Sequence, residues 1–121
     1  MQKHDLEDRL VDFAVLIIEL SNQLPNNEAG KHLKGQIIRS ATSAALNYGE
    51  AQSGESRKDL IHKIKIVLKE LRETFVGLKI IQRAALIKTD EKLTSALSEN
   101  DQLISIFVKS VETAQKNLCK N

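Results

Sequence analysis

The residues whose types and spacing point most directly to chemistry are the cations between residues 58 and 83. They recur at intervals of three and four, which places them along one face of a helix. The members of this row are Lys58, His62, Lys65, Lys69, Arg72, Lys79 and Arg83. Such a row neutralises phosphate groups and releases their counterions, so it predicts a nucleic-acid-binding surface. Lys31 and Lys34 could widen this patch, and an ordinary solvated helix face is the alternative interpretation.

The distribution of charge supports a basic middle section. The chain has a net charge of only +2, but residues 31–83 carry 11 basic against 5 acidic residues, and residues 1–27 carry 2 against 5. The basic row holds no aromatic residue that could stack on a base. Any nucleic-acid binding is therefore expected to be directed at the phosphate backbone, with weak sequence specificity.

A second set of polar residues follows the same helical spacing between residues 36 and 50, beside an apolar face. Its members are Gln36, Arg39, Ser40, Ser43, Asn47 and Glu50. Glu70 and Glu73 offer complementary charges, so the spacing predicts a structural polar network or an oligomer interface, for example Arg39 with Glu73. A solvated polar face is the alternative, because a buried network is costly unless it is fully hydrogen-bonded.

Patterns typical of catalysis or metal binding are missing from the sequence. No histidine follows a glutamate by three residues, as the di-iron helix bundles require, and there is no Gly-rich phosphate loop or Cys-x-x-Cys pair. Ser40 and Ser43 lack an adjacent histidine base. The histidines expected at the surface are His4, His32 and His62. We therefore expect a non-enzyme without metal or cofactor; an enzyme with a metal or redox centre in its core is the alternative, which metal analysis would test.

The elements that position these residues are predicted to be helices. Aromatic residues make up 3% of the chain, Trp is absent, and the apolar residues recur at intervals of three and four. Asp5 is a candidate N-cap, Ser56 with Asp59 resembles a capping box, and the polar stretch 98–101 could break the last helix in two. The predicted helices span residues 5–23, 27–51, 56–83 and 90–117. Long helices with short connections favour an all-α, antiparallel up-and-down four-helix bundle, a single domain over residues 1–121.

Several features indicate a cytoplasmic protein that does not enter a membrane. Cys119 is the one cysteine, so no disulfide can form within the chain. The longest apolar run, residues 13–18, is far shorter than the roughly 20 residues that span a bilayer. The N-terminus lacks the apolar core of a signal peptide.

Three blocks of sequence resemble a known family. They are residues 36–51, residues 56–61 and the run Lys69-Glu-Leu-Arg-Glu-Thr74, and they are similar to the bacterial four-helix-bundle, ribosomal-protein-like proteins encoded in 23S rRNA intervening sequences. The resemblance implies a bundle that assembles into a homopentameric ring. The residues matched in these blocks, for which the resemblance implies a structural role, are Arg39, Ser43, Asn47, Glu50, Glu70 and Glu73. The chain is also similar to the basic accessory variability protein of diversity-generating retroelements, which binds nucleic acid and a reverse transcriptase.

Two functional hypotheses follow. In the first, a homo-oligomeric bundle binds RNA, ribosomal RNA included, or DNA through the basic row. In the second, the protein is an interaction scaffold for a protein partner such as a reverse transcriptase, and the row serves only solubility. Capture of a partner that survives nuclease treatment would favour the second. Both hypotheses allow the row to face outward or to line a central channel.

Overall fold

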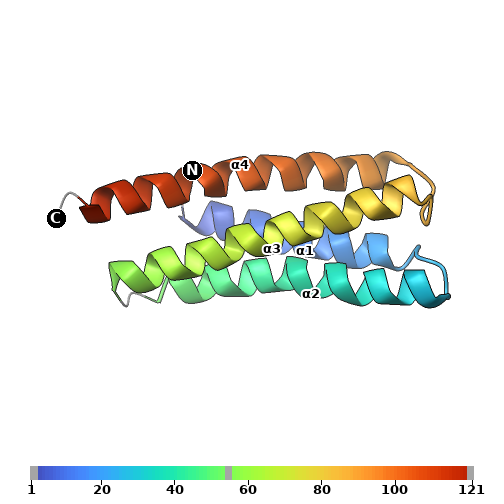
Figure 1. Ribbon diagram of the computed structural model, residues 1–121, viewed down its shortest axis with the longest axis horizontal. Coiled ribbons are helices and arrows are strands. Elements are labelled where there is room, and N and C mark those ends of the chain that lie inside the picture. The colour runs from blue at the N-terminus through green and yellow to red at the C-terminus, as the bar shows by residue number, and fades with distance from the viewer. Residues whose placement is uncertain (1–2, 54–55, 120–121) are drawn as a thin grey trace.

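Four helices follow one another along the chain in the computed structural model, which describes residues 3–53 and 56–119, without the side chains of residues 3, 4 and 119. They are α1 (Lys3–Ser21), α2 (Glu28–Ala51), α3 (Arg57–Arg83) and α4 (Glu91–Cys119). Successive helices run in opposite directions and pack side by side, and α4 returns to pack on α1 (Figure 1). The predicted all-α four-helix bundle is therefore confirmed. The expectations for the side chains of His4 and Cys119 lie outside the described part.

Side-chain caps set the start of three helices. The Asn27 side chain accepts a hydrogen bond from the Gly30 amide at 2.8 Å and caps α2. Ser56 and Asp59 form the predicted capping box of α3. The Leu93 amide donates to Asp90 Oδ1 at 3.0 Å before α4. Each cap satisfies an amide that has no partner within its helix.

Two predictions about helix ends were wrong. Asp5 does not cap the first helix, which begins at Lys3 and contains Asp5 in its first turn. The polar stretch 98–101 does not break the last helix, because α4 is continuous from Glu91 to Cys119. Asn100 is fully buried and its Nδ2 donates to the Leu71 carbonyl of α3 at 3.0 Å, so this polar residue joins two helices.

The connection after α3 uses an unusual backbone conformation. Ala85 has a φ of 54°, and the amides of Ala85 and Leu86 donate to the carbonyls of Gln82 and Ile81. This pair of hydrogen bonds forms a Schellman motif, which ends a helix through one residue in the left-handed conformation. Ile87, 3% exposed, then packs into the core and fixes the path of the loop.

The core runs the length of the bundle and joins all four helices. The largest side chains with less than 2% exposure are Phe13, Phe107, Leu10, Ile17, Leu20, Ile37, Leu71, Leu78, Ile81, Leu93, Leu103 and Val67. The rings of Tyr48 and Phe107 meet edge to face, with centroids 5.5 Å apart. Removal of these apolar surfaces from water is what holds the helices together. Among the described helices, none has an apolar stretch long enough to cross a bilayer.

Candidate nucleic-acid interface

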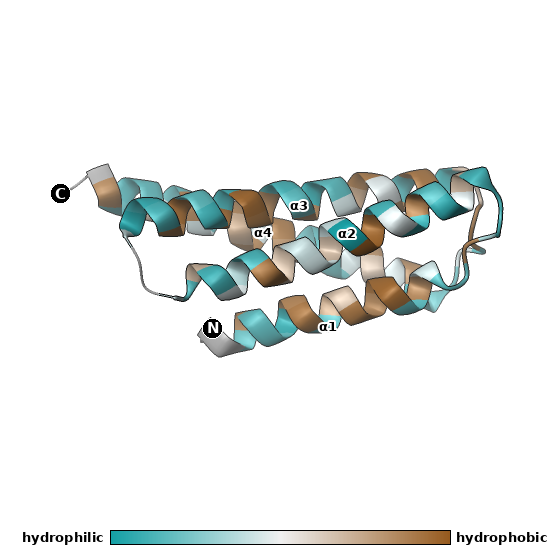
Figure 2. Cartoon of the chain, turned by 90° about the horizontal axis from the view of Figure 1, so that it is seen from below, coloured by the Kyte–Doolittle hydropathy of each residue, from teal (hydrophilic) through white to brown (hydrophobic). Residues whose placement is uncertain are grey.

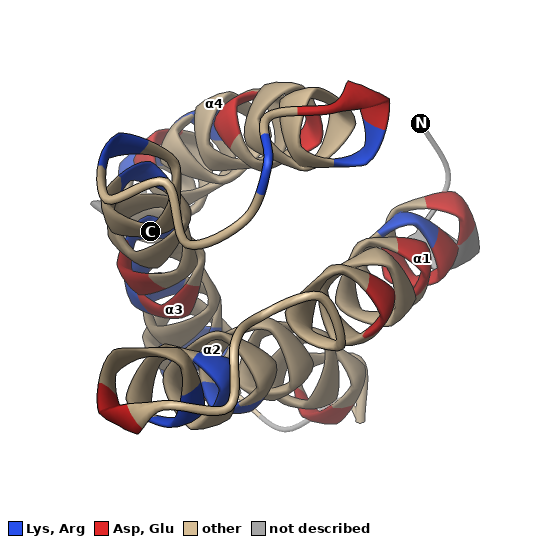
Figure 3. Ribbon diagram, turned by 90° about the vertical axis from the view of Figure 1, so that its right-hand side faces the viewer, with Lys and Arg blue, Asp and Glu red and all other residues tan. Residues whose placement is uncertain are grey.

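The basic row of the sequence lies along the outward face of α3. Val67, Leu71 and Leu78 mark the buried face of this helix, and the basic residues lie on the opposite one. We call the row the α3 stripe; it comprises Lys58, His62, Lys65, Lys69, Arg72, Lys79 and Arg83. All of them are exposed except Lys79, which is half-buried. The stripe therefore presents cations to solvent along α3, and Figure 3 shows the basic and acidic positions of this helix in blue and red.

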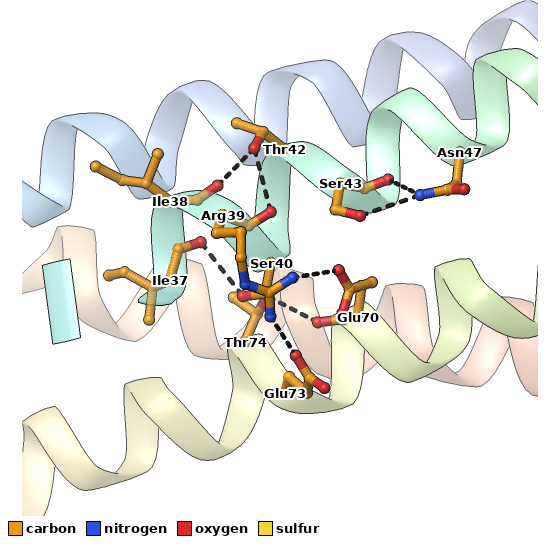
Figure 4. Close-up of polar contacts among 10 residues, drawn as sticks. All are labelled: Ile37, Ile38, Arg39, Ser40, Thr42, Ser43, Asn47, Glu70, Glu73 and Thr74. Carbon is orange, nitrogen blue, oxygen red and sulfur yellow. Dashed lines mark hydrogen bonds and ion pairs between the residues drawn. The ribbon is translucent and has the colours of Figure 1, made fainter. Parts of the chain in front are cut away.

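The acidic residues of α3 are engaged in local contacts, and Glu73 lies at the edge of the stripe, in the groove lined by Lys69 and Arg72. Asp59 accepts a hydrogen bond from the Ser56 hydroxyl at 2.9 Å in the capping box. Glu70 and Glu73 point toward α2, where both bind Arg39 (Figure 4). The helix has eight basic and three acidic residues, so cations outnumber acids along its outward face.

Aliphatic and aromatic atoms interrupt the C-terminal half of the stripe. Val76 and Ile80 are 51% and 47% exposed, respectively. The Lys79 ammonium lies 4.9 Å from the centroid of the Phe75 ring, which is a cation–π contact. The C-terminal half of the stripe is therefore part apolar, whereas the half from Lys58 to Lys69 is purely polar on its exposed face.

The structure does not bring Lys31 and Lys34 to the stripe. Successive residues of a helix are about 100° apart, and Gln36, Arg39 and Ser40 mark the side of α2 that faces α3. By this spacing Lys31 and Lys34 lie on other sides of α2, and neither lines the groove beside the stripe. The α2 residues that line the groove beside the stripe are His32, Leu33 and Gln36.

The predicted partnership between α2 and α3 takes the form of an ion-pair cluster. Arg39 Nη1 lies 2.8 Å from Glu70 Oε2, and Nη2 lies 2.5 Å from Glu73 Oε2, so one guanidinium joins two carboxylates (Figure 4). Beneath it, the hydroxyls of Ser40 and Thr74 are 2.7 Å apart in a fully buried position. These contacts let the polar sides of α2 and α3 pack against each other without leaving a buried charge unpaired.

The remaining members of the predicted network take different parts. Asn47 Nδ2 donates to the carbonyl and hydroxyl of Ser43, one turn earlier in the same helix. Glu50 forms an ion pair with Lys63 of α3. The network therefore has two ion-pair bridges between α2 and α3, one from Arg39 and one from Glu50. The hydrogen-bonded pair Ser43 and Asn47 lies between them on α2.

The environment of Glu70 changes its proton affinity. Burial alone would raise the pKa of this carboxyl, whose side chain is 8% exposed. Hydrogen bonds from the Ser43 hydroxyl and the Arg39 guanidinium outweigh burial, and they lower the pKa of Glu70 below its usual range. Hydrogen bonds to the Glu70 and Glu73 carboxylates raise the pKa of Arg39. Glu70 is thus ionised in the folded protein at neutral pH.

Sequence reasoning missed a third bridge, which joins the first and last helices. Arg9 Nε and Nη2 lie 2.8 and 2.9 Å from the two carboxylate oxygens of Glu99, and Nη2 also donates to Gln102. These residues are 90 or more positions apart, so no local spacing could have indicated the contact. Across the described part of the chain, no group of three or more His, Cys, Asp or Glu side chains is placed to hold a metal ion.

Fold and surface together define a four-helix bundle with one basic helix face. The sequence pattern of the 23S rRNA-intervening sequence proteins matches residues 2–109, and the chain belongs to this family. It is also similar to a crystal structure of a protein of unknown function from the S23 ribosomal protein family of Bacteroides thetaiotaomicron VPI-5482. The identity is 32%, the TM-score is 0.79, and the match covers 88% of this chain and 97% of that one. No curated protein matches the chain.

Proposed function

We propose that this protein binds nucleic acid, either RNA such as ribosomal RNA or DNA, through the α3 stripe. The observation that carries the proposal is the outward row of cations on a helix whose acidic residues are all engaged elsewhere. A phosphate backbone is the polyanion that such a row fits, because each Lys or Arg that neutralises a phosphate releases counterions. The name of the family, which refers to 23S rRNA, makes ribosomal RNA the first ligand to test.

The geometry favours contacts with the backbone over contacts with bases. From Lys58 to Arg83 the stripe is about 38 Å long, at roughly 1.5 Å per residue. Phe75 is the one aromatic residue of α3, and it is half-buried beneath Lys79. The His62 imidazole is the one exposed ring of α3, so binding is expected to follow charge and shape more than sequence.

The proposal contains no catalytic step. The polar residues between α2 and α3 bind one another, as Ser40 with Thr74 and Arg39 with Glu70 show. This arrangement supports a structural role for these residues. Assembly into homo-oligomers remains part of the proposal.

The test is binding of the purified protein to a structured 23S rRNA fragment and to duplex DNA across a salt series. Wild-type affinity should fall steeply with salt. A K58E/K65E/K69E variant should bind at least tenfold more weakly, and the log–log salt slope should become shallower by about 3, roughly one for each lost phosphate contact.

A matched control carries the same charge change outside the stripe. Lys88, Lys109 and Lys116 are exposed and lie in the loop before α4 or on α4. The K88E/K109E/K116E variant should keep most of the wild-type affinity. Absence of binding to either nucleic acid at low salt, or equal losses in both variants, would refute the proposal and favour a scaffold for a protein partner.

A further inference from the structure

The groove beside the α3 stripe combines charged and apolar residues. It is open and has a volume of about 920 Å³. Three cations of the stripe, Lys65, Lys69 and Arg72, also line the groove. Its apolar lining comes from three helices and consists of Leu33, Leu68, Val76, Gly77, Ile80 and Val111. The stripe and the groove are therefore one continuous surface, because the same cations border both.

The apolar part of the groove is open to water. Val76 and Ile80 lie one helical turn apart on α3, and both are exposed. Covering exposed aliphatic surface with an apolar partner is favourable. The volume lies within the range of about 300–1,000 Å³ that is typical of sites for small organic groups. The groove is therefore suited to a group with an apolar face.

Polar side chains of α2 border the same groove. Among the described residues, neither the His32 imidazole nor the Gln36 amide has a hydrogen-bond partner, so both are available to a ligand. Glu73, the acidic residue of the lining, is already bound by Arg39. Imidazole and amide groups can donate to and accept from the polar edge of a nucleobase. The groove thus offers cations for a phosphate, aliphatic surface for the face of a base and polar groups for its edge.

We propose that this groove takes an unpaired nucleobase from the strand whose phosphates bind the α3 stripe. The inference rests on the proposed function and narrows its ligand to nucleic acid with unpaired bases. Phosphates held by Lys65, Lys69 and Arg72 bring the strand to the border of the groove. The face of a base then covers Val76 and Ile80.

A duplex cannot make the same contacts. Its bases are paired and stacked on one another, so it presents phosphates to the stripe and leaves the aliphatic lining in water. Bases in single strands and loops are free to turn outward. Aliphatic side chains cover every base in the same way, so the groove selects the unpaired state and not a sequence.

The experiment separates the contribution of the base from that of the backbone. Fluorescence anisotropy measures binding of three labelled DNA probes: an oligothymidylate strand, an abasic strand of the same length and charge, and a duplex. Wild type should bind the oligothymidylate about tenfold more tightly than the abasic strand, because only a base can cover the aliphatic lining.

The variant V76S/I80S removes the aliphatic surface and keeps every cation. Its preference for the oligothymidylate over the abasic strand should fall below about threefold, while its log–log salt slope stays as in wild type because no phosphate contact is lost. Its affinity for the duplex should not change. The unchanged slope distinguishes this variant from K58E/K65E/K69E, which loses phosphate contacts.

A matched control makes the same pair of substitutions on another helix. Val11 and Ile18 are 46% and 40% exposed on α1, along which Figure 2 shows apolar segments recurring. α1 and α3 lie at opposite corners of the bundle and do not pack on each other (Figure 3). The V11S/I18S variant should therefore keep the wild-type preference. Circular dichroism establishes that both variants are folded.

The outcomes distinguish this inference from the proposed function. Equal affinity of wild type for the oligothymidylate and the abasic strand, with steep salt dependence, would overturn the inference and leave the proposed function standing. The inference also fails when V76S/I80S keeps the preference or when V11S/I18S loses it. Absence of binding to all three probes would overturn both and favour an acidic protein segment as the ligand of the groove.

Discussion

Arg39 holds two carboxylates, and its removal should show how much the α2–α3 cluster contributes to stability. In Arg39→Ala, Glu70 keeps its largely buried position but loses the guanidinium 2.8 Å away. We expect the free energy of unfolding to fall by about 1–2 kcal/mol, since a charged hydrogen-bonding group then loses its partner. Urea unfolding measures the change.

The matched control is Arg72→Ala, which removes the same side chain from the exposed outward face of the neighbouring helix. Its effect should stay within about 0.5 kcal/mol. Equal losses in the two variants would show that the cluster contributes nothing beyond an ordinary surface arginine. A double-mutant cycle between Arg39→Ala and Glu70→Gln isolates the pairwise part.

The lowered pKa of Glu70 predicts how stability depends on pH. In the unfolded chain this carboxyl titrates near its usual value of 4.5, and in the folded protein it titrates lower. Below pH 4.5 the unfolded state therefore binds the proton more readily, so the contribution of Glu70 is complete above that pH and is lost as the pH falls through the folded value. Urea unfolding between pH 6 and 3 should show a loss for wild type that is smaller in Glu70→Gln.

At the scale of the helix, two glycines of α2 provide a comparison of packing with backbone propensity. A Cβ at Gly30 would lie 2.0 Å from the Pro25 carbonyl oxygen, so Gly30→Ala must displace the α1–α2 connection. A Cβ at Gly35 would meet nothing within 4 Å. We expect Gly30→Ala to lose about 1–3 kcal/mol and Gly35→Ala to gain about 0.5–1 kcal/mol, both measured by urea unfolding. Effects of the same sign would contradict this account.

Helix positions were largely predictable from the sequence, because local signals determine them. The predicted second and third helices, 27–51 and 56–83, each begin one residue before the observed helix and end at the same residue. The stretch 98–101 was misjudged for a physical reason: the partner of Asn100 is the Leu71 carbonyl, 29 residues earlier in the chain. In the local sequence, a polar residue whose hydrogen-bond partner lies on a distant helix looks the same as a polar residue that ends a helix.

At the scale of the whole molecule, the sequence predicted which residues share a face but not which faces meet. The spacing indicated the α3 stripe and the Arg39–Glu73 partnership, since both depend on helical repeat and charge. It gave no sign of the Arg9–Glu99 bridge. It also grouped Lys31 and Lys34 with the α3 stripe, whereas both lie on other sides of α2. Which residues of two helices face each other depends on the rotation of each helix about its own axis, and the packing of the core determines that rotation.

The helix that carries the cations is also the one held most firmly. α3 packs extensively on both α2 and α4, whereas the α1–α4 contact is the smallest between neighbours. The backbone of so constrained an element loses little further conformational entropy when a ligand binds, so the ordering cost falls on the lysine and arginine side chains. A polyanion that binds there meets a row of cations on a helix whose backbone is held in place. The flexible partner therefore has to adjust its curvature and phosphate spacing to the protein.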